Sequence, residues 1–400
     1  MANQVNPPRG MRDILPAEKA LREQLLAVVR NTYLARGFQE IETPALEDLS
    51  KLTSGQGGDN EKLVFQVLKR GNELDQALES GKDLADLGLR FDLTVPLTRY
   101  YASNHSKLPR VLKALQIGPV WRAERPQKGR YRQFLQCDID IIGDSSFLAE
   151  AELLSASLAA LEALGLADAT IRVNHRELLL ANISAIGVTK GQSPKAMIVI
   201  DKLDKIGIDG VAKELAELFS DDVAVAAKSW LSSLNEAEFP EVLQPLVSSM
   251  GPLASRLRYD ASLVRGMGYY TGAIFEIEHP AAGSAIGGGG RYDSMVGKWL
   301  GSDVPAVGIS LGIERIIELA NLPETTTSNI ALLVESAEQS GAALVIQNEI
   351  ISSGATCRIE VKHKNLKAQL EALAGMGFDS FAVLSQGISK LSELDIRKLD

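Results

Sequence analysis

The sequence predicts an α+β fold in two parts: an antiparallel sheet that carries helices over residues 1–325, and a small α/β domain over residues 328–400. Before residue 320, short strand candidates bounded by glycine alternate with helices at hairpin-like spacing. After it, strand and helix patterns alternate as βαβαβ over about 70 residues, which is typical of a small parallel sheet. A chain of 400 residues also has room for two or three domains.

Helices are expected in the first part where apolar residues recur at helical spacing or where alanine, leucine and glutamate are abundant. The first helix begins near Pro16, since proline suits the first helical position. A second helix spans 147–164, and residues 207–255 are mainly helical. The apolar runs 89–101 and 111–121 suit either buried strands or packed helices. The strand candidates are 40–43, 133–142, 170–173, 196–200, 263–278, 285–291 and 304–309.

The second part follows the run 325–328, which is the best linker candidate in the chain. Its helices are expected at 337–351 and 366–376. Its strands are expected at 330–334, 356–361 and 381–384. The stretch 358–367 carries four basic residues and one acidic residue, which suggests a small patch that faces phosphate groups.

Composition excludes several classes of protein. Apolar residues make up 45% and charged residues 23%, values that rule out collagen-like, disordered and small disulfide-rich proteins. No apolar run approaches the ~20 residues of a membrane helix, and the first ten residues lack the apolar segment of a secretory signal. The two cysteines, Cys137 and Cys357, form no CxxC pair, so we expect neither a zinc site nor a disulfide framework. A reducing cytoplasm fits best.

The net charge of −9 argues against a general nucleic-acid binder but permits a local concentration of positive charge. Between residues 107 and 132 the chain carries eight basic residues and one acidic residue, Glu124. The sequence contains no HExxH motif, no Walker A loop and no complete dinucleotide fingerprint. If a nucleotide is bound, we therefore expect arginine side chains to hold it.

Residues 121–140 place basic side chains around a Pro–Gly loop between two strand candidates. Arg122 stands at a strand end, where its position can be fixed, and a guanidinium binds phosphate oxygens in pairs. Residues 263–276 place Arg265 before two glycines and the pair Tyr269–Tyr270. On a strand, only one tyrosine of that pair would point into a given pocket. Taken alone, these segments are also compatible with a solvated hairpin and a core strand.

Residues 285–293 contain four successive glycines flanked by apolar and aromatic residues. We interpret them as a strand whose missing side chains admit a flat ligand, since a flexible linker would carry serine or proline. In the segment 307–316, Gly308 and Gly312 could form a floor under a planar base. Asp92, two residues before Thr94, is a further candidate, although a helix cap is the better explanation of this segment taken alone.

The order of these segments resembles the class II aminoacyl-tRNA synthetases and, among them, the histidyl-tRNA synthetase family. Residues 6–16 are similar to the usual opening of that family, and Glu42-Thr43-Pro44 is similar to motif 1, the dimer-interface strand. Motif 2 is matched by 121–140 and motif 3 by 307–316, and the two histidine-specific motifs are matched by 263–276 and 285–293. The resemblance extends from about residue 6 to 320 and is weaker beyond.

The resemblance implies that histidine and ATP·Mg²⁺ form histidyl-adenylate, and that the histidyl group then passes to tRNA(His). It implies that Arg122 and Arg265 are catalytic, that Mg²⁺ is held mainly through the ATP phosphates without a protein metal site, and that no tightly bound organic cofactor is needed. The residues implied to bind histidine are Asp92, Thr94, Arg122, Gln136, Asp140, Arg265, Tyr269, Tyr270, Gly288 and Gly289. Those implied to bind ATP are Arg122, Glu124, Arg130 and Arg315, and those implied to meet the tRNA acceptor end are Arg125 and Gln127.

The resemblance further implies a homodimer, a variable insertion over about 174–258 and an anticodon-binding role for 328–400. Two features depart from the family pattern: Gly268 stands where many relatives carry aspartate, and the C-terminal domain is short. The alternatives are a non-catalytic paralogue that binds histidine and regulates histidine biosynthesis, and an RNA-binding module without activity. Both are disfavoured because the three candidate arginines, Arg122, Arg265 and Arg315, are present.

Overall fold

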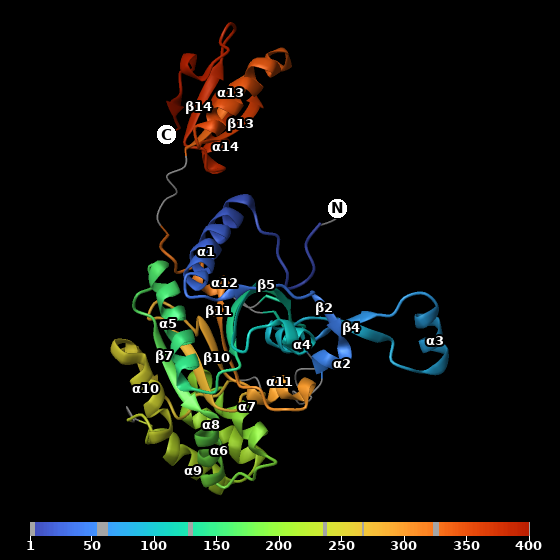
Figure 1. Cartoon of the computed structure of the whole chain (residues 1–400), viewed down its shortest axis with the longest axis vertical. Coiled ribbons are helices and arrows are strands. Elements are labelled where there is room, and N and C mark those ends of the chain that lie inside the picture. The colour runs from blue at the N-terminus through green and yellow to red at the C-terminus, as the bar shows by residue number, and fades with distance from the viewer. Residues whose placement is uncertain are drawn as a thin grey trace. The chain divides into compact units, whose positions relative to one another are not determined.

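The computed structural model describes residues 5–53, 63–126, 131–234, 238–265, 268–322 and 328–399. These residues form two compact units (Figure 1). The first unit contains Met1–Asp13 and Gln24–Asn321, and the second contains Ile14–Glu23 and Leu322–Asp400. In the described part of the chain, no helix combines the length and the apolar character needed to cross a membrane.

The first unit is built on an eight-stranded sheet in the order β1-β5-β6-β11-β10-β9-β7-β8. From β5 to β7 every pairing is antiparallel, whereas the edge pairs β1–β5 and β7–β8 are parallel. This arrangement confirms the predicted antiparallel sheet. Its strands are β1 (Gln39–Glu40), β5 (Leu112–Trp121), β6 (Gln133–Ile142), β7 (Thr170–His175), β8 (Leu257–Tyr259), β9 (Ala273–Glu278), β10 (Gly287–Arg291) and β11 (Ala306–Gly312).

Helices bury the apolar parts of this sheet. α5 (Phe147–Ala163) packs against β6 and β11, and α4 (Thr94–Asn104) packs against α11 (Asp293–Leu300). Side chains of α4 and α11 share an apolar cluster with Leu112 and Ile142. Ile142 lies on the same face of β6 as Asp138 and Asp140, because side chains alternate along a strand. That face is therefore apolar at one end, under the two helices, and polar at the other.

Smaller elements surround the large sheet. The N-terminal helix and the short helix after β11 are α1 (Pro16–Leu34) and α12 (Ile313–Ile316). A second sheet has the strand order β2-β4-β3. The elements of this region are β2 (Leu46–Asp48), α2 (Leu49–Thr53), β3 (Phe65–Leu68), α3 (Asn72–Ser80) and β4 (Ala85–Leu89).

The predicted helical insertion is present, with one error in its assignment. Its helices are α6 (Arg176–Ala185), α7 (Ser193–Ile200), α8 (Leu203–Leu218), α9 (Asp221–Ser232) and α10 (Gln244–Met250). The strand expected at 196–200 is wrong, because these residues belong to α7. Pro194 lies in its first turn, and Ala196 and Ile200 pack into a buried cluster of helices. A short apolar run fits a buried helix as well as a strand.

The strand expected at 263–278 is also shorter than predicted, since β9 begins only at Ala273. Tyr269 and Tyr270 come before it, in a turn and an irregular segment. The extended segment expected at 40–43 is likewise reduced to the two-residue β1. Residues 266 and 267 lie outside the described part of the chain.

The second unit contains the predicted βαβαβ pattern. The elements are β12 (Asn329–Val334), α13 (Ser340–Ser352), β13 (Thr356–Val361), α14 (Leu366–Gly375), β14 (Ser380–Leu384) and β15 (Arg397–Lys398). β12 is central and parallel to β13 and β14, whereas β15 adds an antiparallel edge that the sequence analysis did not predict. Three of the four residues of the expected linker 325–328, residues 325–327, lie outside the described residues.

Candidate active site

One face of the large sheet carries a row of directly paired residues from five strands. Arg172 on β7 pairs with Glu276 on β9, which pairs with Gly288 on β10. Gly288 pairs in turn with Ser310 on β11, and Ser310 pairs with Asp138 on β6. Residues that lie directly opposite each other in antiparallel strands point to the same face. The register therefore assembles an arginine, a glutamate and an aspartate that are far apart in the sequence.

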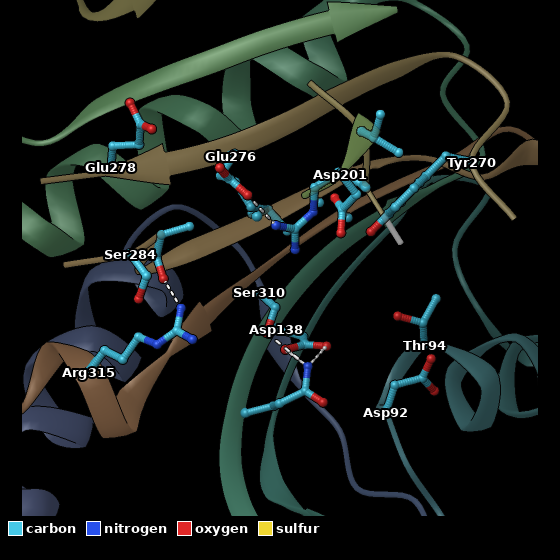
Figure 2. Close-up of a pocket in the computed structure, with 18 of the residues that line it drawn as sticks. Asp92, Thr94, Asp138, Asp201, Tyr270, Glu276, Glu278, Ser284, Ser310 and Arg315 are labelled. Atoms are coloured by element: carbon cyan, nitrogen blue, oxygen red, sulfur yellow. Dashed lines mark hydrogen bonds and ion pairs between the residues drawn. The ribbon is translucent and has the colours of Figure 1, made fainter. Parts of the chain in front are cut away.

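Above this row lies a cavity of about 840 Å³. Figure 2 shows Asp92 and Thr94 on one side of it, Tyr270, Asp201 and Glu276 on the opposite side, and Asp138 with Ser310 between them. The sequence-predicted residues that line this cavity are Asp92, Thr94, Arg122, Glu124, Gln136, Asp140, Arg265, Tyr269, Tyr270, Gly288, Gly289 and Arg315. The structure thus brings twelve predicted residues together in one place.

The glycines of β10 create space for side chains of the chain itself. A Cβ at Gly288 would lie 2.7 Å from Cζ of Arg265, and a Cβ at Gly290 would lie 2.8 Å from Cδ1 of Tyr270. At both positions a side chain of the protein itself takes the space that the missing side chain leaves, whereas the backbone of Gly288 still lines the cavity. Gly308 is misassigned as the floor for a base, because its Cβ would lie 1.8 Å from Oδ1 of Asp140. The glycines let these side chains lie close to the sheet.

Three tyrosines form the aromatic end of the cavity. The ring centroids of Tyr269 and Tyr270 are 4.8 Å apart, and those of Tyr269 and Tyr292 are 6.1 Å apart. The Tyr292 hydroxyl donates a hydrogen bond of 2.6 Å to Oδ1 of Asp140. The expectation that only one tyrosine of the 269–270 pair could reach the cavity is wrong, because neither residue lies on a strand and both line it.

Buried hydrogen-bond acceptors also line the cavity. Oδ1 of Asp92 accepts a hydrogen bond of 3.1 Å from the Val95 amide, so Asp92 also caps the start of α4. Among the described residues, Oδ2 of Asp92, Oε1 of Gln136 and Oδ2 of Asp140 are buried without a hydrogen-bond partner. Buried polar atoms of this kind are normally paired. Together they fit a ligand that carries several N–H donors.

Burial strongly perturbs the carboxyl groups of this site. Desolvation raises the pKa of Asp92 to about 6, although the Val95 amide and Arg122 act against the shift. Desolvation likewise raises the pKa of Asp138 to about 7, and the charge of Asp92 adds to it. The pKa of Asp140 lies well above its usual range because of burial and the nearby Asp138. A positively charged ligand would favour the ionised form of all three groups.

Arginines line the remaining wall. Arg122 donates from Nε to the Phe91 carbonyl at 2.9 Å, and its guanidinium lies 5.0 Å from the ring centroid of Phe134. Arg265 donates from Nη1 to Oε2 of Glu276 at 2.8 Å. Burial acts to lower the pKa of Arg265, but Tyr270 and Glu276 outweigh it and raise that pKa above its usual value. This arginine therefore stays charged.

A second cavity of about 320 Å³ lies next to the first and shares several of its residues. Arg122, Arg265 and Arg315 line both cavities, and Phe134 and Gly312 line the second. Arg315, on α12, donates a hydrogen bond from Nη1 to the Ala285 carbonyl. The three arginines thus stand where an anion that bridges the two cavities would lie.

Some predicted site residues are not placed in these cavities. Arg125 is exposed and lines neither of them. Gln127 and Arg130 lie outside the described residues. Within the described ranges, no group of three or more histidine, cysteine, aspartate or glutamate side chains is arranged to hold a metal ion.

Sequence analysis missed several residues that line the cavity, among them Asp138, Glu276, Tyr292 and Ser310. Asp138 carried a usable signal, because Gln136, Asp138 and Asp140 alternate with apolar residues along β6 and so share one face. Glu276 and Ser310 carried none, since their place depends on which strands pair and in what register.

The chain is similar to known proteins over most of its length. The sequence profile of the family described as histidyl-tRNA synthetase matches residues 10–316. The chain belongs to the histidyl-tRNA synthetase family. This confirms the family, the class II synthetase fold and the aminoacyl-tRNA synthetase activity predicted from the sequence, an activity that uses ATP and a divalent metal ion.

Individual members of the histidyl-tRNA synthetase family match along nearly their whole length. A histidine–tRNA ligase of Leifsonia xyli subsp. xyli is 49% identical, covering 100% of this chain and 99% of its own. A probable histidine–tRNA ligase of Tropheryma whipplei is 39% identical, covering 94% and 95%. The crystal structure of histidyl-tRNA synthetase from Nostoc sp. PCC 7120 is similar with a TM-score of 0.75 at 26% identity, covering 99% and 95% of the two chains.

Proposed function

We propose that this chain activates histidine with ATP·Mg²⁺, forms histidyl-adenylate and pyrophosphate, and transfers the histidyl group to tRNA(His) in the cytoplasm. The observation that carries the proposal is the division of one cavity into an acidic side, an aromatic end and a wall of three arginines. Histidine has a matching set of groups: an ammonium, an imidazole and a carboxylate. The carboxylate is the group that must meet the α-phosphate of ATP.

The ammonium group of histidine is assigned to Asp92, Thr94 and Gln136. Oδ2 of Asp92 and Oε1 of Gln136 are buried acceptors without a hydrogen-bond partner in the described chain, and an ammonium supplies three donors. Asp92 is fixed in place, because its other carboxylate oxygen accepts from the Val95 amide. Asp138 lies in the same cavity and adds negative charge when it ionises. Binding of the ammonium would satisfy atoms that are otherwise costly to bury.

The imidazole ring of histidine is assigned to the aromatic end, near Gly288 and Gly289. Asp140 is assigned to the ring and not to the amino group, because the hydrogen bond from Tyr292 holds it among the tyrosines. Its free Oδ2 can accept from one ring nitrogen, and Tyr270 can donate to the other. A site that pairs with both ring nitrogens rejects isosteric side chains strongly, because a wrong ligand leaves buried polar groups unpaired.

The chemical step is attack by a histidine carboxylate oxygen on the α-phosphorus, which forms a new O–P bond as the bond from the α-phosphorus to the bridging oxygen of pyrophosphate breaks. Both reactants are anions, so catalysis depends on positioning and on neutralisation of charge. Arg122 contacts the carboxylate and the α-phosphate, and Arg265 stabilises the charge that develops there. Arg315 and Arg130 are assigned to the outer phosphates, and Mg²⁺ enters as part of the ATP complex.

Adenine is assigned to the second cavity, between the Phe134 ring and the Arg315 side, with Glu124 at its edge. Arg125 is exposed and, with Gln127, is assigned to the acceptor end of the tRNA. Residues 328–400 are proposed to form the anticodon-binding domain. Its basic stretch is partly neutralised, since Arg358 pairs with Glu360 at 2.6 Å.

The rival function is a histidine-binding regulatory paralogue, which would need no catalytic arginines. The three arginines converge on the cavity wall, and the relatives of highest identity reported above are named as ligases. The deciding experiment is ATP–pyrophosphate exchange with each of the twenty amino acids. Exchange that depends on histidine and Mg²⁺ is expected. Histidine binding without exchange above background would establish the regulatory function instead.

A further inference from the structure

Outside the substrate-contacting set, Arg172 pairs with more carboxylates than any other arginine or lysine among the described residues. Only 8% of this side chain is exposed, and it does not line the cavity. It contacts four carboxylates: Asp204 at 2.9 Å, Asp260 at 2.6 Å, Glu276 at 3.2 Å and Glu278 at 3.1 Å. The proposed reaction assigns no role to this cluster.

Within the cluster, Glu276 faces two arginines at once. Its Oε1 accepts from Nη1 of Arg172, and its Oε2 accepts from Nη1 of Arg265 at 2.8 Å. Each carboxylate oxygen therefore has one arginine partner, so the rotation of the Glu276 carboxylate is fixed from both sides. Without Arg172, the Glu276 carboxylate could rotate, and the Arg265 guanidinium bound to it would move as well.

The sheet register sets the geometry of the contacts among Arg172, Glu276 and Arg265. Arg172 and Glu276 are directly paired across β7 and β9, and Glu276 is directly paired with Gly288. The guanidinium of Arg265 occupies the space that a side chain at position 288 would fill. Arg172, Glu276 and Arg265 thus form a continuous series of alternating charge that starts in the sheet and ends at the cavity.

The helical insertion contributes to the same cluster. Asp204 lies in the first turn of α8 and pairs with Arg172, although its side chain is 71% exposed. The other three carboxylates come from β9 and from the segment that follows β8. Arg172 therefore links the insertion to the strand that carries Glu276.

We propose that Arg172 is a positioning residue for adenylate formation: it orients Glu276 and, through Glu276, holds the Arg265 guanidinium in its working position. This inference rests on the proposed role of Arg265. A purely structural ion cluster would predict lower stability with unchanged turnover for each correctly folded site. If instead Arg172 acts through Glu276 on Arg265, which we call the relay, loss of Arg172 lowers turnover only when Arg265 is present.

The test is a double-mutant cycle between Arg172→Lys and Arg265→Ala, measured by ATP–pyrophosphate exchange and normalised to the titrated active sites. Arg172→Lys keeps the charge but loses the fork that contacts several carboxylates. We expect it to lower kcat about tenfold, since small displacements of a catalytic group are costly, with KM for ATP and histidine changed less than about threefold. In the Arg265→Ala background it should have almost no further effect on kcat.

A milder variant covers the case in which Arg172→Lys is not recovered in folded form. Asp204→Asn removes one exposed partner of Arg172 and should lower kcat by about twofold to threefold, again only when Arg265 is present. The matched control is Asp209→Asn, which removes a carboxylate of the same helix that pairs with Lys228 at 2.5 Å. It should leave kcat unchanged.

The outcomes separate the two hypotheses. Equal losses from Arg172→Lys with and without Arg265, or a loss only in the fraction of active sites, would overturn the relay. Normal turnover in Arg265→Ala alone would overturn the proposed role of Arg265, and with it the premise of the relay. If Arg265→Ala is slow and the two changes are non-additive, the positioning role stands.

Discussion

Gly288→Ala tests whether the position of Arg265 limits the rate of adenylate formation. The new Cβ would lie 2.7 Å from Cζ of Arg265, 2.8 Å from its Nη2 and 2.8 Å from the Phe275 carbonyl oxygen. Carbon atoms in contact normally stand about 3.5–4.0 Å apart. The guanidinium must therefore move by roughly 1 Å, because the carbonyl belongs to the sheet and the side chain is the freer partner.

A displacement of that size in a positioned catalytic group can cost about a hundredfold in rate. We therefore expect Gly288→Ala to lower the single-turnover rate of adenylate formation about a hundredfold. Overpacking should also lower the free energy of unfolding by about 1–3 kcal/mol. The assay is rapid-quench formation of histidyl-adenylate with both substrates saturating, alongside thermal unfolding of the same samples.

The matched control is Gly287→Ala, on the neighbouring residue of the same strand. Its Cβ would also meet a backbone oxygen at 2.8 Å, that of Ser310, but its other contacts are the side chains of Ile277 and Leu311. It should lose a similar amount of stability and much less rate. Equal rate losses in the two variants, or a normal rate in Gly288→Ala, would refute the argument that the space above Gly288 exists for Arg265.

Three further predictions concern charge, domains and assembly. Asp138 has a pKa raised to about 7, so the folded chain binds its proton more tightly than the unfolded chain, and stability falls as pH rises from about 4 to 7. Asp138→Asn should therefore raise the free energy of unfolding above pH 7 by up to about 4 kcal/mol while weakening histidine binding. Urea titrations of both proteins at pH 5 and pH 8 measure this gain, and an equal difference between the two proteins at both pH values would show that the pKa of the carboxyl is not raised. Deletion of 328–400 should leave pyrophosphate exchange largely intact and impair tRNA aminoacylation, and an equal loss of both in a folded truncation would contradict the domain assignment. Light scattering at micromolar concentration should give the mass of a dimer, because the segment Glu42-Thr43-Pro44 resembles the interface motif of the family; a monomer mass would refute it.

Short-range pattern accounts for the parts of the fold that sequence analysis predicted. β6 was predicted with its observed bounds, since residues 133–142 combine an apolar run with polar alternation. The βαβαβ unit was also predicted, because each of its elements is bounded by a turn and has one clear period. In both cases the signal lies within about ten residues and does not depend on what the segment packs against.

The errors occurred where tertiary contacts decide the local structure. Residues 196–200 form part of α7 because their apolar side chains pack against other helices of the insertion, which a five-residue pattern cannot reveal. Tyr269 and Tyr270 were expected on a strand, but the chain becomes extended only at Ala273. Their place before the strand is what allows both rings to reach the cavity.

The candidate site residues also divide into those that a local sequence motif predicts and those that only tertiary contacts place. Those carried by a recognisable motif, such as Arg122, Arg265 and Arg315, were predicted and line the cavity. Glu276 was missed even though it belongs to one of those segments, because its significance comes from pairing with Arg172 on one side and Gly288 on the other. Strand register is a property of the whole sheet, so no single segment specifies it.

The three buried carboxyl groups of the site lower the stability of the protein when no ligand is bound. Asp92, Asp138 and Asp140 share one buried region, and burial raises the pKa of each. Ionisation of one group opposes ionisation of the next, so the empty site resists the charges that the ligand requires. In the proposed site, the ammonium group of histidine supplies the missing positive charge, lowers these pKa values and releases the bound protons as it binds. We therefore expect histidine affinity to be linked to proton release and to weaken as the pH falls through 7 towards 6, the range in which Asp138 and Asp92 become protonated.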